Sequence, residues 1–211
     1  MMTHITRART ALAWALCVCT LGCRTVVLGA DASEGRSPNI LLMTVDNLGY
    51  GDLHCYNAKS KIVTPRLDEF AKQGVRLTQF YTASSTCTVS RACLLTGRIA
   101  QRHGLLDQLA GVNGNYGVGL NQSEILIPQL LKQSSPTYVS GCFGKWNIGF
   151  TPGSRPTDRG FDTFVGHVSG NIDYFHHNYH DRHDLYEGTT RDGLHELHRE
   201  GEYSTDIFAD A

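Results

Sequence analysis

The chain has 211 residues, of which 41% are hydrophobic and 18% charged, and its formal net charge at pH 7 is −1. This composition is that of a globular protein that can bury the core of one domain, and it excludes an intrinsically disordered chain. The balanced charge and the lack of a basic run argue against a nucleic-acid partner or an anionic membrane surface.

The first 32 residues have the layout of a secretory signal peptide. Arg7 and Arg9 precede an apolar block over residues 11–21, and Ala-Asp-Ala at residues 30–32 offers a small-residue cleavage site. We therefore expect an exported protein, periplasmic or extracellular, with a signal peptide at 1–32 and a folded domain over 38–211. A lipoprotein anchor at Cys23 is the alternative, because Leu-Gly precedes this cysteine and the block is shorter than the ~20 residues of a spanning helix.

Residues 39–45 are apolar at nearly every position, which predicts a strand buried on both faces of a parallel sheet. The glycine-rich residues 46–52 then predict a loop at the carboxyl end of that strand, where open α/β sheets bind their ligands. Asp46 and Asn47 offer hard oxygen atoms, which suit Ca²⁺ or Mg²⁺ better than a soft transition metal. Taken alone, the pair is more typical of a turn in which the side chains bond their own backbone.

Helices and strands alternate along the rest of the domain. We expect a helix that opens at Pro65 and stops at Gly74, a strand over 75–80, a helix from Ser123 to about Lys132, and a strand from Tyr138 to Phe143. From Arg159 onward the chain is rich in Gly, His and Asp, which predicts loops and short hairpins.

Cys87 stands where a Ser/Thr-rich loop meets an apolar run, which predicts a position near a helix N-terminus. Free backbone N–H groups and the helix dipole there favour a bound anion, and Arg91 follows one turn further on. A lone cysteine is otherwise most often a small buried hydrophobe. The spacing from Cys87 to Arg91 is too short for the oxyanion loop of a thiolate phosphatase, so that chemistry is not expected.

Three motifs resemble those of the type I sulfatases. The first is CTVSRACLLTGR at residues 87–98, which resembles C-x-P-S-R-A-x-x-x-T-G-R with Val89 in place of Pro. The second is VDNLGYGDL at 45–53, which resembles DDLGYGDL. The third is GKWNIG at 144–149, which resembles GKWHLG. Residues 159–162 and 169–175 match more loosely. The resemblance runs from Pro38 to the last residue. It implies an α/β sandwich like alkaline phosphatase, with a mostly parallel central sheet, truncated before its C-terminal part.

The same resemblance implies a sulfuric ester hydrolase of the arylsulfatase type. A formylglycine-generating or anaerobic sulfatase-maturing enzyme would convert Cys87 into formylglycine, whose hydrate attacks the sulfate ester. Arg91 would steady the hydrate through a charge-assisted hydrogen bond, and Lys145 would contact the sulfate. The implied substrate is a sulfated small molecule or polysaccharide.

Metal and substrate ligands are also implied by the resemblance. Asp46, Asn47 and the modified Cys87 would bind a divalent cation, Ca²⁺ or Mg²⁺, and Asn147 and Ser169 would contact the substrate. Asn147 stands where the family has His, and its amide can donate a hydrogen bond but cannot take up and return a proton.

Three alternatives remain open from the sequence. The first is a catalytically inactive truncated remnant, since the family's second metal pair lies in a later Asp-Asn-Gly loop. The second is a phosphate or phosphonate ester hydrolase of the same fold. The third is a metal-binding protein that uses His176, His177, His180 and His183, although their irregular spacing is more typical of a solvated loop.

Overall fold

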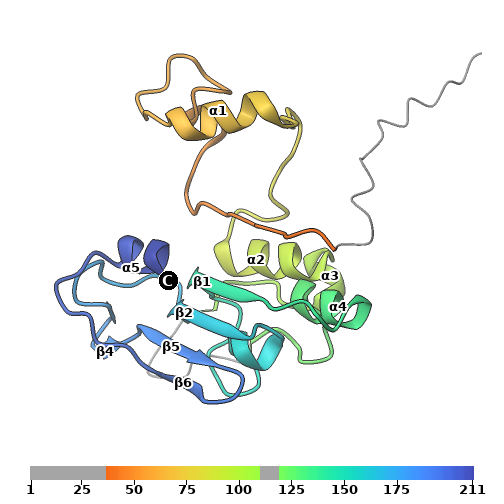
Figure 1. Cartoon of the computed structure of the whole chain (residues 1–211), viewed down its shortest axis with the longest axis vertical. Helices are drawn as coiled ribbons and strands as arrows, with labels where there is room; N and C mark the ends of the chain where they lie inside the picture. Colours follow the sequence, from red (N-terminus) through yellow and green to blue (C-terminus); the bar gives the residue numbers. More distant parts are fainter. Residues whose placement is uncertain (1–36, 110–118) are drawn as a thin grey trace, which may run out of the picture. The chain divides into compact units, whose positions relative to one another are not determined.

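The computed structural model describes residues 37–109 and 119–211 (Figure 1). The chain divides into two compact units, Met1–Val45 and Asp46–Ala211. The predicted signal peptide, its cleavage site and Cys23 lie outside the described residues. Among the helices of the described part, none is long and apolar enough to cross a membrane.

Residues 37–45, the described part of the first unit, form no strand. Their large apolar side chains are exposed, and Leu41 keeps 87% of its surface accessible. A strand exists only through hydrogen bonds to a neighbouring strand, and the strand pairs of the described chain do not include these residues. The prediction of a buried strand over 39–45 is therefore wrong for this structure, because an apolar run is buried only where another element covers it.

The second unit is organised around a four-stranded mixed sheet within its described residues, ordered β1-β2-β5-β6. The strands are β1 Gly141–Lys145, β2 Thr163–His167, β5 Tyr186–Thr189 and β6 Gly193–Glu196. β1 and β2 run parallel with Lys145 opposite His167, and the other two pairs are antiparallel. β3 (Asn178–Tyr179) and β4 (Arg182–His183) form a separate two-stranded sheet. The hairpins expected after Arg159 are confirmed.

The described helices are α1 Pro65–Gln73, α2 Cys87–Thr96, α3 Ala100–His103, α4 Ile127–Ser134 and α5 Ser204–Asp210, with 3-10 turns at Tyr50–Asp52 and Pro156–Arg159. In Figure 1, α2, α3 and α4 gather on the β1 side of the sheet, away from β6. The helix predicted from Pro65 to Gly74 is confirmed, because Pro occupies its first turn and Gly74 its C-cap.

Three element boundaries differ from the prediction. Residues 75–80 form no strand and are exposed, so that prediction is wrong. The predicted strand at 138–143 is present but begins at Gly141. The helix expected from Ser123 begins at Ile127, because the Ser123 hydroxyl donates to Asn121 Oδ1 at 3.0 Å instead of capping the helix.

The hydrophobic core of the second unit joins α2, β2 and the segments beside them. Its buried members are Ala92, Leu120, Leu126, Trp146, Ile148, Phe150, Phe164 and Val168. Trp146 follows β1 directly, and its backbone N–H donates to His167 O at 2.9 Å, while Asn147 N donates to Val168 O at 3.2 Å. The pairing of β1 with β2 thus continues past Lys145. This continuation fixes the backbone that carries Lys145 and Asn147.

Candidate active site

Helix α2 begins at Cys87, with Thr86 as N-cap, which confirms the predicted helix start. Thr88, Val89 and Ala92 are buried and anchor the first turns of the helix. At the other end, Gly97 takes a left-handed conformation (φ 66°) and donates its N–H to Cys93 O at 2.9 Å. Cys87 is half-buried, so the residue at the helix start remains partly accessible.

Two side-chain amides contact the sulfur of Cys87. The thiol donates to Gln108 Oε1 at 3.1 Å, and Asn147 Nδ2 donates to Cys87 Sγ at 3.2 Å. Gln108 Oε1 also accepts the backbone N–H of Thr88 at 3.1 Å, so it joins the thiol to the first turn of α2. Sequence reasoning missed Gln108, because a single glutamine in a loop carries no spacing signal.

Arg91, Lys145 and Asp46 form one charged network. Lys145 Nζ donates to Asp46 Oδ2 at 2.5 Å, and an Arg91 guanidinium nitrogen lies 3.9 Å from the same oxygen. Arg91 also donates to the backbone oxygen of Lys145 at 2.6 Å. Side chains separated by about a hundred positions in the sequence therefore meet, and Asn147, two residues after Lys145, links this network to Cys87.

The charges of this network determine the ionisation of its members. Partial burial raises the pKa of Asp46, but the hydrogen bond from Lys145 and the positive charges of Lys145 and Arg91 outweigh it and hold this pKa below its ordinary value. Burial lowers the pKa of Arg91, and the charges of Asp46 and Cys87 oppose that shift. The arrangement is thus an ionised carboxylate between two cations.

The donor chemistry at Asp46 and Asn47 is that of a hard-cation ligand pair: an ionised carboxylate beside an amide oxygen. Asn47 has a left-handed backbone (φ 57°), a conformation that asparagine tolerates. Residues 37–109 and 119–211 contain no group of three or more His, Cys, Asp or Glu side chains that could hold a metal ion. The histidines from 176 to 183 therefore form no such cluster there.

Asn147 combines burial with an unusual backbone conformation. It is fully buried and has a left-handed backbone (φ 58°). While its Nδ2 contacts Cys87, its Oδ1 is buried without a hydrogen-bond partner among the described residues. An unpaired buried acceptor costs about 1–3 kcal/mol. The amide therefore retains an unused capacity to accept a hydrogen bond.

His167 is a second residue that sequence reasoning missed. It lies opposite Lys145 across the β1–β2 pair and is buried. Burial, followed by the charges of Lys145 and Arg91, lowers the pKa of His167 to about 3. The imidazole is therefore neutral at physiological pH.

Ser169, predicted to contact substrate, is fully buried in the loop after β2. Its hydroxyl donates to Asn171 O at 2.9 Å, and its N–H donates to Asp184 Oδ2 at 2.9 Å. These contacts order the loop and give the hydroxyl an internal partner. Contact of Ser169 with substrate stays a prediction.

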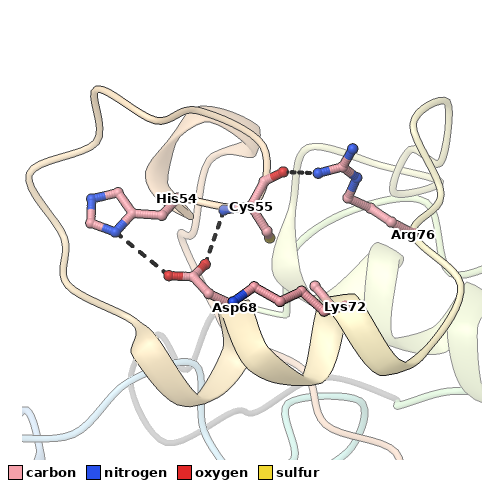
Figure 2. Close-up of a pocket in the computed structure, with 6 residues that line it drawn as sticks. His54, Cys55, Asp68, Lys72 and Arg76 are labelled. Atoms are coloured by element: carbon pink, nitrogen blue, oxygen red, sulfur yellow. Dashed lines mark hydrogen bonds and ion pairs between the residues drawn. The ribbon is translucent and has the colours of Figure 1, made fainter.

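A separate pocket of about 320 Å³ lies between α1 and the residues before and after it (Figure 2). In Figure 2, Asp68 of α1 accepts from Cys55 N at 2.9 Å and lies 3.5 Å from His54 Nδ1, and Arg76 donates to Cys55 O. None of the predicted site residues lines this pocket. Its polar groups instead connect α1 to the flanking loops.

Comparison with known proteins identifies relatives over most of the chain. The Sulfatase family profile matches residues 38–211. The N-acetylgalactosamine-6-sulfatase of Homo sapiens is 41% identical over 144 residues, which cover 66% of this chain and 27% of that protein. The chain thus spans about a quarter of the length of this relative.

Solved structures agree with that match. Ps i-CgsB aligns with a TM-score of 0.68 and 31% identity, covering 82% of this chain and 39% of that one. Ps i-CgsB in complex with k-i-k-neocarrahexaose aligns with a TM-score of 0.64 and 30% identity, covering 77% and 37% of the two chains. With an alkaline-phosphatase-like α/β fold and a family match over most of its length, the chain belongs to the sulfatase family.

Proposed function

We propose that this chain carries the nucleophile and part of the sulfate-binding site of a sulfuric ester hydrolase. The nucleophile is a formylglycine derived from Cys87 by a maturation enzyme, which supplies the oxidant. The observation that carries the proposal is that Cys87, at the start of α2, is linked through Asn147 and Lys145 to Arg91 and Asp46. Membership of the sulfatase family supports the same reaction.

In the proposed reaction, the side chains act through charge and position. Arg91 and Lys145 neutralise the anionic oxygens that accumulate charge as the ester bond breaks. Their positions are held by burial of α2 and by the continued β1–β2 pairing. Asn147 donates a hydrogen bond without transferring a proton.

Asp46 and Asn47 are the proposed ligands for Ca²⁺ or Mg²⁺, together with the oxygen that replaces the Cys87 sulfur. A hard cation takes six or more oxygen ligands, so these residues would supply only part of its shell. When bound, the cation adds positive charge beside the sulfate. Lys145 and Arg91 would then share Asp46 with it.

The proposed substrate is a sulfate ester, and a sulfated carbohydrate is favoured. N-acetylgalactosamine-6-sulfatase is the name of one relative, and a solved relative binds a carrageenan oligosaccharide. A sulfated small molecule remains the other substrate class. We further propose that residues 1–32 direct export of a sulfatase domain at 38–211.

Production of the full chain together with a maturation enzyme tests the proposal. Mass spectrometry of the Cys87 peptide should show the aldehyde, and sulfate should be released from a sulfated oligosaccharide or an aryl sulfate. Cys87→Ala should abolish release, while Cys55→Ala, at the separate pocket, should leave it unchanged. An unmodified thiol in the presence of an active maturation enzyme would contradict the proposal, as would greater release of phosphate than of sulfate from matched esters.

A further inference from the structure

The hydrogen-bonding groups around Cys87 do not match the needs of a thiol. Gln108 Oε1 and Asn147 Oδ1 are acceptors, and Asn147 Nδ2 is a donor. A thiol has one proton, which is directed at Gln108. Asn147 Oδ1 is therefore left buried without a partner within the described part of the chain.

Exchanging the oxygen and nitrogen of the Asn147 amide does not remove the mismatch. The amide nitrogen would then occupy the buried position that lacks a partner. In either orientation, the thiol satisfies one polar atom of Asn147 and leaves the other unpaired. Buried polar groups in proteins are nearly always paired, so the unpaired atom of Asn147 is available to a different chemical group at residue 87.

We propose that Gln108 and Asn147 are positioning residues for the hydrated form of an aldehyde at residue 87, an inference that rests on the proposed function. Water adds across the carbonyl bond: its oxygen bonds to the carbon and one of its protons goes to the carbonyl oxygen. The resulting geminal diol has two hydroxyl donors and four lone pairs. It can donate to both amide oxygens and accept from Asn147 Nδ2 at the same time.

The surroundings hold the two amides in place. Asn147 is fully buried, with its backbone N–H bonded to Val168 O, so the amide is held in place. Gly170 faces both amides: a Cβ built there would lie 3.6 Å from Asn147 Oδ1 and 3.3 Å from Gln108 Nε2. A side chain at residue 170 would therefore crowd Gln108, and glycine lets the backbone approach both amides without displacing them.

The test measures how much free aldehyde the converted chain exposes. Methoxyamine forms an oxime with the free aldehyde, with loss of water, but not with the diol. Gln108→Ala removes one hydrogen bond to the diol and Asn147→Gly removes two, and glycine keeps the left-handed backbone at 147. Each variant should therefore label about fivefold faster than the native sequence.

Two controls separate hydration from access and from folding. Gln101→Ala removes an exposed amide from α3 and should not change the labelling rate. The rate at which iodoacetamide alkylates Cys87 in unconverted chains is measured at a pH where it no longer rises with pH, so that it reports access to the thiolate, and the labelling rates are divided by it. Gln108 is exposed, so its variant keeps the test valid if Asn147→Gly fails to fold.

The outcomes distinguish the two proposals. If mass spectrometry finds no aldehyde at residue 87, both the proposed function and this inference are overturned. If the aldehyde forms but the corrected labelling rates of both variants equal the native rate, only the positioning role of Gln108 and Asn147 is overturned. Faster labelling in the variants, with Gln101→Ala unchanged, supports that role independently of catalytic turnover.

Discussion

Two carboxylates of the second unit are kept ionised by cations from distant parts of the chain. Asp46 pairs with Lys145 and Arg91 in the candidate site, whereas Asp162 pairs with Lys132 of α4 at 2.6 Å. Asp162 also accepts the backbone N–H of Ser140 at 2.8 Å. The first carboxylate thus belongs to the chemistry of the site, and the second connects α4 with the start of β1.

Replacement of Asp162 should make stability depend less on pH. Burial raises the pKa of Asp162, but the hydrogen bonds from Lys132 and Ser140 lower it more, so the pKa lies below its ordinary value. A lowered pKa stabilises the fold above about pH 4, and this contribution is lost as the pH falls through the folded-state value. Asp162→Asn should therefore cost about 1–2 kcal/mol at pH 7 and much less near pH 3, as measured by urea unfolding.

The exposed Asp181 provides the matched control for this prediction. Asp181→Asn should change the free energy of unfolding by less than about 0.5 kcal/mol at either pH. A loss for Asp162→Asn that is equally large at both pH values would contradict the electrostatic explanation.

At the scale of elements, the segment before α4 depends on one buried guanidinium. Arg159 is 2% exposed and donates to the backbone oxygens of Leu120, Asn121 and Glu124 at 2.8–3.2 Å. Leu120 belongs to the core. Arg159, which sequence analysis placed only in a loosely matching motif, therefore joins the turn after β1 to the core.

Arg159→Leu should be strongly destabilising. The substitution leaves three carbonyl groups without their donor, and each unpaired buried group costs about 1–3 kcal/mol. We expect a total loss of at least about 3 kcal/mol in the free energy of unfolding, measured in urea. Arg191→Leu, at an exposed position in the β5–β6 turn, is the control and should have little effect. A loss below 1 kcal/mol for Arg159→Leu would show that water replaces the guanidinium.

At the scale of the whole molecule, sequence patterns located the candidate site better than they located the strands around it. The start of α2 at Cys87 and the meeting of Arg91, Lys145 and Asp46 agree with the motifs, because a local signal fixes each residue type. Gln108 and His167 could not be found in this way. Gln108 reaches Cys87 through the path of a loop, and His167 is defined only by the register of β1 with β2.

At residues 39–45 and 75–80, by contrast, the sequence pattern predicts strands that the structure does not contain. Both have strand-like patterns, yet the described structure leaves them unpaired by strands and exposed. The spacing of apolar residues indicates that a segment is suited to a sheet, but strand pairing also requires a partner strand elsewhere in the fold. The residues of one short segment do not identify the partner strand with which it would pair.

Leu41 distinguishes the observed exposure from the buried strand that the pattern predicts. Because its side chain is 87% exposed, Leu41→Asp should change the free energy of unfolding by less than about 0.5 kcal/mol. A carboxylate at the centre of a buried strand would instead cost several kcal/mol. Thermal and urea unfolding of the full chain measure the difference, with Leu126→Asp, at a fully buried core position, as the destabilising control.

The register between β1 and β2 makes the position of Lys145 in the candidate site depend on the burial of Trp146 in the hydrophobic core. Lys145 and Trp146 are adjacent, but one bonds Asp46 and the other lies in the core. If β1 slipped by one residue along β2, each side chain would move to the face now taken by its neighbour. The Lys145 ammonium would then enter the hydrophobic core, and the Trp146 indole would leave it. Packing of Trp146 in the core therefore also keeps the Lys145 ammonium directed at Asp46, so selection for a stable fold preserves the position of this charge.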